Sequence, residues 1–104
     1  MKLSVVIISF KSDHLLKKLL INFPKKYQII IVENSLLKST KELKKKFKNI
    51  NIIIPNENLG YSKAFNKALE KCDNDFVLTI TPDVLISKNL ILKLEKILNN
   101  FKKF

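Results

Sequence analysis

The sequence predicts an α/β domain built on an open, four-stranded parallel sheet with helices on both faces. Four short runs rich in Ile, Val and Leu have continuous instead of alternating apolar residues, which is typical of strands buried on both sides. Segments with helical spacing separate these runs, and right-handed crossovers in such an alternating chain give a parallel sheet. A length of 104 residues allows one modest core, so we expect a single domain over residues 1–104.

The four apolar runs predict the strands in chain order. Their lengths and β-branched content match buried strands, and polar residues bound each of them. The predicted strands are Leu3–Ser9, Gln28–Glu33, Asn51–Ile54 and Asp75–Ile80.

A helix is predicted after each strand. The first begins near Ser12 and ends before Pro24, and the fourth follows Ser87. The second opens with a capping-box pattern, in which Ser39 and Glu42 would each accept a free backbone N–H. The positions expected to face the core are Leu15, Leu16, Leu19, Leu20 and Phe23 in the first helix, Ala64, Phe65, Ala68, Leu69 and Cys72 in the third, and Leu90, Leu94, Ile97, Leu98 and Phe101 in the fourth.

The composition excludes several classes of protein. One cysteine, Cys72, and one histidine, His14, are too few for a disulfide framework or a Cys/His zinc site, and they favour a reducing compartment, so we expect the cytoplasm. His14 falls in the first turn of a helix, where we expect it to be exposed. No apolar run is long enough for a bilayer span or a signal peptide. A single glycine excludes the Rossmann dinucleotide fingerprint and the P-loop.

The net charge of +11 comes entirely from lysine and is uneven. Residues 1–52 carry 12 lysines against 3 acidic residues, and residues 53–104 carry 8 against 6. Such an excess suits phosphate-bearing partners, including nucleotides and an anionic membrane surface, although AT-rich codon usage explains it equally well. The chain has no arginine and no tryptophan, so we expect no specific nucleic-acid binding.

Polar residues follow the strands at the edge where parallel sheets bind ligands. Gly60, the only glycine, precedes a helix, where it would permit either a positive φ or the close approach of a ligand. Asp83 is a carboxylate suited to Mg²⁺ or Mn²⁺, or else a turn residue bonded to its own backbone. The four exits are Ser9-Phe10-Lys11-Ser12, Glu33-Asn34-Ser35, Pro55 to Gly60, and Thr81-Pro82-Asp83.

Taken together, these exits resemble the nucleotide-sugar-binding half of glycosyltransferase family 2, which has the GT-A fold. Ser4 to Lys11 is similar to the family's first strand and its exit, and Ile31 to Ser35 to the second-strand motif whose acid contacts the donor nucleoside. Asn58 to Asn66 is similar to the Asn-x-Gly-aromatic motif that opens a helix. Val77 to Val84 resembles the metal motif found in bacterial rhamnosyltransferase-like members, with Asp83 in the place of the metal-binding Asp.

The resemblance implies an inverting, nucleotide-sugar-dependent glycosyltransferase with a GT-A/Rossmann-like sheet of order 3-2-1-4. It implies a UDP-, dTDP- or GDP-linked donor and hexosyl or deoxyhexosyl transfer to a polysaccharide or lipid-linked acceptor. The concentration of lysine in residues 1–52 fits peripheral contact with an anionic membrane where lipid-linked acceptors reside, although codon usage explains it as well. Asp83 would bind a divalent cation, Mg²⁺ or Mn²⁺. The residues that would bind the nucleotide are Ser9, Phe10, Lys11, Glu33, Asn34, Ser35, Asn58, Gly60 and Thr81.

The chain also departs from the family pattern. Glu33 stands in place of the usual Asp, Thr81 in place of an acid or Asn, and Phe65 in place of a residue that is often polar. Family members continue into an acceptor-binding half that carries the catalytic base. We therefore expect residues 1–104 to form a truncated, donor-binding part without a catalytic base. The alternative is an incomplete nucleotide-binding or interaction module that requires a partner chain or an oligomer.

Overall fold

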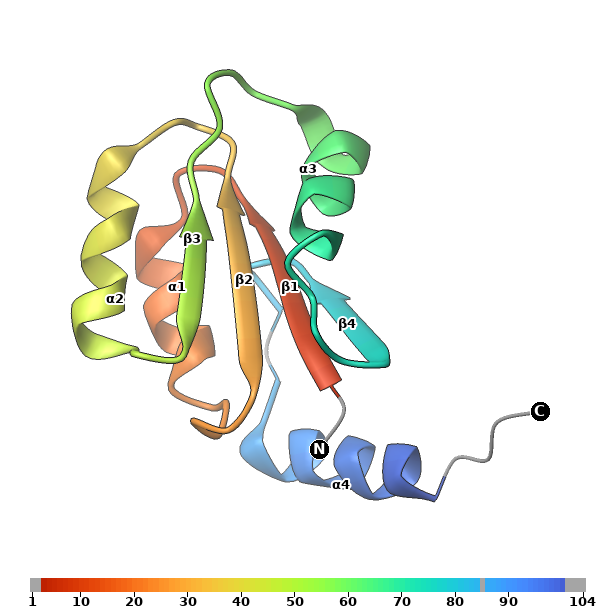
Figure 1. Cartoon of the computed structure of the whole chain (residues 1–104). Coiled ribbons are helices and arrows are strands. Elements are labelled where there is room, and N and C mark those ends of the chain that lie inside the picture. Colours follow the sequence, from red (N-terminus) through yellow and green to blue (C-terminus); the bar gives the residue numbers. More distant parts are fainter. Residues whose placement is uncertain (1–2, 85, 101–104) are drawn as a thin grey trace.

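A computed structural model confirms the predicted four-stranded parallel sheet with helices on both faces (Figure 1). The strand order is β3-β2-β1-β4, as expected. Residues 3–84 and 86–100 are described by the structure. In chain order the elements are β1 (Leu3–Ser9), α1 (Asp13–Leu20), β2 (Gln28–Glu33), the 3-10 helix η1 (Lys38–Glu42), α2 (Leu43–Lys46), β3 (Ile50–Ile53), α3 (Gly60–Leu69), β4 (Phe76–Ile80) and α4 (Lys88–Asn99).

The two central strands, β1 and β2, separate two layers of core. Val5 and Ile7 of β1 face the larger layer, which α1, α2 and α4 cover, whereas Val6 faces the smaller layer beneath α3. This two-sided burial explains the continuous apolar runs. The edge strands β3 and β4 each have one neighbour and are only partly buried, because their outer sides lack a covering strand among the described residues.

Two of the predicted helix starts are found in the structure. Ser87 caps α4, since its Oγ accepts a hydrogen bond from the Leu90 N–H at 3.1 Å. Ser12 precedes α1, but its hydroxyl donates to the Phe10 carbonyl at 3.0 Å and does not cap the helix. His14 in the first turn of α1 is exposed, as expected.

The predicted capping box at Ser39 and Glu42 is wrong. Both residues lie inside η1, and the residue before that helix is Leu37, which forms no side-chain cap. The cause is tertiary: Thr40 is fully buried, and its hydroxyl donates to Asp13 Oδ1 of α1 at 2.8 Å. This contact draws the segment onto α1 as a tight 3-10 turn, so Ser39 never takes the extended conformation of an N-cap.

The prediction of the buried face of α4 is wrong in part. Leu94 and Leu98 pack against the core, but Leu90 is 53% exposed and Ile97 is 64% exposed, and Ile91 is buried in their place. Apolar residues of α4 lie on most of its sides, so the sequence pattern was compatible with more than one choice of buried face. Contacts to Glu95 from the segment just before β2, in the same core layer, set the rotation: the Tyr27 hydroxyl donates to Glu95 Oε2 at 2.5 Å, and Lys26 Nζ lies 2.6 Å from Oε1. Phe101 lies outside the described residues.

Three smaller differences concern element ends. β3 begins one residue earlier and ends one residue earlier than predicted, and β4 begins at Phe76 instead of Asp75. α3 ends at Leu69, which is partly exposed, so Cys72 lies beyond the helix while still packing beside the smaller core layer. Within the described residues, none of the helices combines the length and apolar character that a membrane span requires.

Candidate functional site

The exits of β1 and β2 are joined at the carboxyl edge of the sheet, the end to which the arrows in Figure 1 point. Ser9 and Glu33, the last residues of the two strands, are register partners. The Asn34 N–H then donates to the Ser9 carbonyl at 2.8 Å. This bond continues the ladder one step past the strands, so the two predicted exits form one unit.

The Glu33 carboxylate organises both exits from a fully buried position. Its Oε2 accepts hydrogen bonds from the Lys11 N–H at 3.0 Å, from the Ser35 N–H at 3.2 Å and from the Ser35 hydroxyl. Burial by itself would raise the pKa of Glu33, but the hydrogen bonds from Ser35 and Lys11 outweigh it and hold the pKa below its ordinary value. The neighbouring Ser9 hydroxyl acts in the same direction. Glu33 is therefore an ionised group that fixes the backbone around it.

Two buried polar atoms at this junction keep unused hydrogen-bonding capacity. Among the described residues, neither Glu33 Oε1 nor Ser9 Oγ has a partner in good hydrogen-bonding geometry, and both are inaccessible to solvent, although the Ser9 hydroxyl is near enough to lower the pKa of Glu33. An unsatisfied buried polar atom costs roughly 1–3 kcal/mol, so the two atoms weaken this junction unless the Ser9 hydroxyl turns toward Glu33.

The exit of β1 holds a strained backbone and presents two side chains. Lys11 has a φ of +52°, a left-handed conformation that is uncommon for residues other than glycine. The Phe10 ring is 55% exposed, and Lys11 Nζ lies 5.8 Å from its centroid. Since Glu33 holds the Lys11 N–H, the buried acid maintains the strain that directs these two side chains outward.

Asn34 connects this unit to the start of α3. Its Nδ2 donates to the Gly60 carbonyl at 3.0 Å, and its Oδ1 accepts from the Leu59 N–H at 3.2 Å. Asn58 completes the turn, because its Oδ1 accepts from the Gly60 N–H at 2.8 Å. These contacts occupy the Asn34 amide within the protein and make it a positioning residue for the α3 turn.

Gly60 is required for its conformation. Its φ is +71°, and a Cβ built on it would meet no atom within 4 Å. Of the two explanations for this glycine, the structure therefore supports the positive φ. The turn sets the direction of α3 and brings the amino end of that helix to the carboxyl edge of the sheet (Figure 1).

The exit of β4 carries the predicted metal ligand. Asp83 is exposed, and its Oδ1 accepts a hydrogen bond from Thr81 Oγ1 at 2.6 Å. The Val84 N–H donates to the Thr81 carbonyl at 3.1 Å, which closes a turn around Pro82. Asp83 is thus a turn residue, but it accepts its hydrogen bond from the Thr81 side chain and not from its own backbone. That bond uses Oδ1, which leaves the second carboxylate oxygen for a cation.

The donor set at Asp83 fits a cation that the protein would share with a ligand. Among the described residues, no group of three or more His, Cys, Asp or Glu side chains could enclose a metal. Mg²⁺ and Mn²⁺ are commonly held by one or two carboxylates together with water and substrate phosphates. One exposed carboxylate oriented by a neighbouring hydroxyl satisfies that requirement, whereas it could not form a cage by itself.

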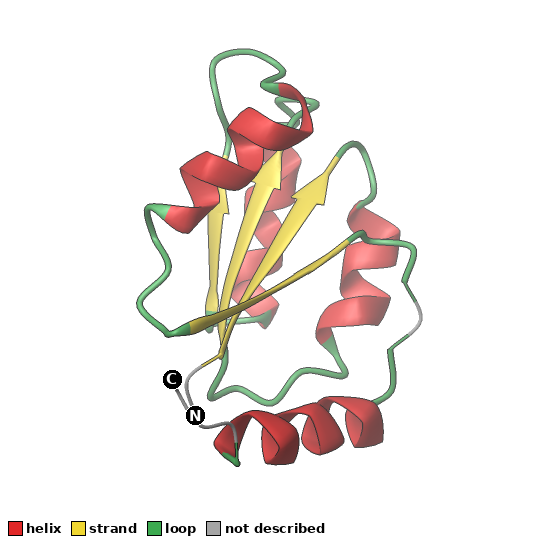
Figure 2. Ribbon diagram, turned by 90° about the vertical axis from the view of Figure 1, so that its right-hand side faces the viewer, coloured by secondary structure: helices red, strands yellow, loops and turns green. Residues whose placement is uncertain are grey.

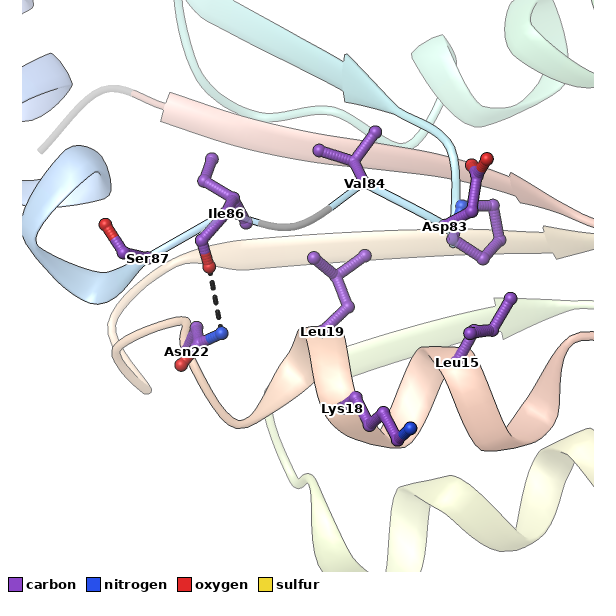
Figure 3. Close-up of a pocket in the computed structure, with 9 residues that line it drawn as sticks. Leu15, Lys18, Leu19, Asn22, Asp83, Val84, Ile86 and Ser87 are labelled. Carbon is purple, nitrogen blue, oxygen red and sulfur yellow. Dashed lines mark hydrogen bonds between the residues drawn. The ribbon is translucent and has the colours of Figure 1, made fainter.

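A groove of about 300 Å³ adjoins Asp83 between α1 and the segment that leads from β4 to α4. Leu15 and Leu19 of α1 lie across it from Val84 (Figure 3). The Asn22 amide donates to the Ile86 carbonyl at 2.9 Å and holds the segment against α1. Asp83, the candidate metal ligand, therefore belongs to a segment that Asn22 holds against α1.

One pair of residues at this edge was not predicted from the sequence. The hydroxyls of Tyr61 in α3 and Thr79 in β4 lie 2.9 Å apart, and the Tyr61 ring, 51% exposed, stacks on Phe65 with centroids separated by 6.2 Å. The pair links the α3 turn to β4, next to the Thr81 exit. The sequence signal for this pair was the aromatic residue directly after Gly60, but the sequence did not indicate that this residue contacts Thr79 of β4.

The structure thus brings the predicted site residues to one edge of the sheet, on three neighbouring strand exits and the α3 turn. Their roles in binding a nucleotide stay predictions. Comparison with known proteins adds one finding: the sequence matches the family model described as Glycosyl transferase family 2 over residues 4–103. No curated protein sequence matches the chain.

Proposed function

The chain belongs to glycosyltransferase family 2, whose members are nucleotide-sugar-dependent glycosyltransferases, and we propose that it binds its donor nucleotide at the carboxyl edge of the sheet. The observation that carries this proposal is the buried Glu33 carboxylate. It holds the strained Lys11 backbone, so that Phe10 and Lys11 project from the edge. Strain that the surrounding structure maintains is characteristic of preorganised ligand sites.

The exposed side chains of the β1 exit suit a nucleoside diphosphate. The Phe10 ring offers a face for a base to stack on, and the Lys11 ammonium offers a charge for a phosphate oxygen. The turn at the start of α3 would support the site indirectly, since it is held by contacts of Asn34, Asn58 and Gly60.

Asp83, at the neighbouring exit, would hold the divalent cation on which the family generally depends. When bound, such a cation neutralises the charge that develops on the departing nucleoside diphosphate. Thr81 orients the Asp83 carboxylate through its hydroxyl. Transfer then forms a bond from an acceptor hydroxyl to the anomeric carbon as the bond to the diphosphate oxygen breaks, and a general base takes the hydroxyl proton.

Isothermal titration with UDP, dTDP and GDP, each with and without Mn²⁺, tests the proposal. We expect one nucleotide to bind at least tenfold more tightly with Mn²⁺ than without it. The dTDP titration also tests the deoxyhexosyl donor that the Thr81-Pro82-Asp83 exit suggests. This titration tests the donor site by itself, because nucleotide binding can be measured without an acceptor.

Asp83→Asn is the informative variant, because the amide keeps the size of the side chain and an acceptor for the Thr81 hydroxyl. It should lose the Mn²⁺-dependent gain in affinity and retain the weaker binding without metal. Glu70→Gln is the matched control, since Glu70 is an exposed acid at the far end of α3. The proposal fails if no nucleotide binds, or if Asp83→Asn and Glu70→Gln bind with the same metal dependence.

A further inference from the structure

The end of the molecule opposite the strand exits carries lysines beside exposed apolar side chains. We call it the basal surface, and it has two parts. One is a groove between the turn after α1 and the segment before β3. The other is the outer side of α4, which lies across the amino ends of the strands (Figures 1 and 2). The two parts adjoin, because Lys26 and Tyr27, next to the groove, both contact Glu95 of α4.

The groove has an apolar floor and a basic rim. Its volume is about 490 Å³, and Leu20, Phe23 and Phe47 contribute to its walls. Ile21 on its edge is 63% exposed, among the most exposed large apolar side chains of the described residues. The rim is formed by three exposed lysines, Lys25, Lys46 and Lys48.

The rim lysines are not neutralised within the protein. None of the three forms an ion pair with an acidic side chain of the described residues, in contrast to Lys26 and Lys45, which pair with Glu95 and Glu42. The residues that line the groove include these three lysines and no acidic residue. The acid of α4, Glu95, is occupied by Lys26 and by the Tyr27 hydroxyl.

α4 also carries lysines beside exposed apolar side chains. Its buried side faces the core through Ile91, while Leu90 and Ile97 are 53% and 64% exposed. Lys93 and Lys96 lie on the same exposed part of the helix. Lysines flanking exposed aliphatic residues are typical of helices that lie in the interface of an anionic bilayer, with the apolar side chains among the lipids and the ammonium groups at the phosphates.

We propose that the basal surface docks on an anionic phospholipid membrane, with Ile21, Leu90 and Ile97 entering the interface and the rim lysines contacting lipid phosphates. Nucleic acid fits this surface less well, because readers of nucleic acid use arginine forks and exposed aromatic rings, and the chain has no arginine. Docking by this end leaves the strand exits facing away from the membrane. It goes beyond nucleotide binding, and the two activities can fail separately.

Sedimentation of the whole protein with vesicles tests the proposal. We expect binding to phosphatidylglycerol vesicles, no binding to phosphatidylcholine vesicles, and weaker binding as salt concentration rises. The combined variant Lys25→Gln, Lys46→Gln and Lys48→Gln should bind about a hundredfold more weakly. Ile21→Ser with Ile97→Ser should lose about tenfold, and because both residues are exposed, the circular dichroism spectrum should be unchanged.

The matched control is Lys38→Gln, Lys63→Gln and Lys67→Gln, which removes the same charge from exposed positions outside the basal surface. It should bind within about threefold of the parent. Equal losses of vesicle binding in the two triple-lysine variants would overturn the proposal, because binding would then depend on the total charge of the protein and not on the basal surface. An absence of vesicle binding would also overturn it, including the case in which the protein binds only RNA or a second copy of itself. Asp83→Asn should bind vesicles like the parent, so a failure of docking is distinguishable from a failure of nucleotide binding.

Discussion

Two carboxylates at the same edge of the sheet, Glu33 and Asp83, are held in opposite ways. Glu33 is fully buried and accepts three hydrogen bonds on one oxygen, two of them from backbone N–H groups. Asp83 is exposed and accepts one, from Thr81. The comparison separates two tasks of an acid at a strand exit. The first organises the backbone of the exit, and the second leaves an oxygen exposed, where we propose that a cation binds.

The largest effect on stability is expected from Glu33→Ala. It leaves two N–H groups and a hydroxyl without their charged acceptor in a buried position, so the free energy of unfolding should fall by about 3 kcal/mol. Glu33→Gln, which keeps an oxygen acceptor, should lose about half as much. Urea denaturation followed by circular dichroism measures both. A loss of less than about 0.5 kcal/mol for Glu33→Ala would contradict the organising role.

Acid should remove the contribution of Glu33 progressively. Hydrogen bonding holds its pKa in the folded protein below the ordinary value of 4.5, so the folded state binds the proton less readily than the unfolded state does. The stabilisation is complete above pH 4.5 and is lost as the pH falls through the lower, folded pKa. Denaturation midpoints measured across this range should fall more steeply for the parent than for Glu33→Gln. Parallel curves would show that Glu33 is not the group responsible.

Asn34→Ala is expected to cost about 2 kcal/mol, because it removes both side-chain bonds that tether the α3 turn. Amide hydrogen exchange should accelerate first in the early turns of α3. Asn34→Asp keeps the acceptor for the Leu59 N–H but places a carboxylate oxygen against the Gly60 carbonyl in a buried position, so its cost should be at least as large as that of Asn34→Ala. Uniform exchange changes across the sheet would argue against a local tether.

Gly60→Ala should cost about 1 kcal/mol through backbone strain alone. The φ of +71° is unfavourable for alanine, whereas the space around the added Cβ is open. Ser62→Ala, at an exposed position in the same helix, is the control and should be neutral or slightly stabilising. A neutral Gly60→Ala would mean that the turn relaxes to a negative φ.

The smallest effect on stability is expected at Asp83. Asp83→Asn should change the free energy of unfolding by less than about 0.5 kcal/mol, because the side chain is exposed and its bond to Thr81 can be kept. The same variant should abolish the Mn²⁺-dependent part of nucleotide binding. A loss of stability comparable to that of Glu33→Ala would remove the distinction between the two acids.

Much of this architecture could be predicted from local sequence. The continuous apolar runs of β1 and β2 identify strands buried on both faces, and their polar exits mark the edge at which we propose that the nucleotide binds. Ser87 caps α4 as expected, since a cap depends on residues only three positions apart. The position of Asp83 after β4 follows from the same pattern.

Other features depend on contacts between segments far apart in the chain. Thr40 bonds Asp13 and converts a predicted capping box into a 3-10 turn. Glu95 meets Tyr27 and turns Ile91 inward and Ile97 outward, although the spacing of α4 allowed either face. The Tyr61 and Thr79 pair and the clamp from Asn34 to Gly60 are also of this kind.

The element order, the sheet type and the residues at each strand exit thus follow from local sequence, because hydrophobic burial and helix starts depend on neighbouring residues. Which contacts the exit residues make depends on the tertiary fold. The structure showed that the Asn34 amide is occupied by the α3 turn, that Glu33 is buried and holds backbone N–H groups, and that Asp83 is open. Whether a polar side chain is saturated or available depends on which distant donors reach it, and the fold brings those donors to it.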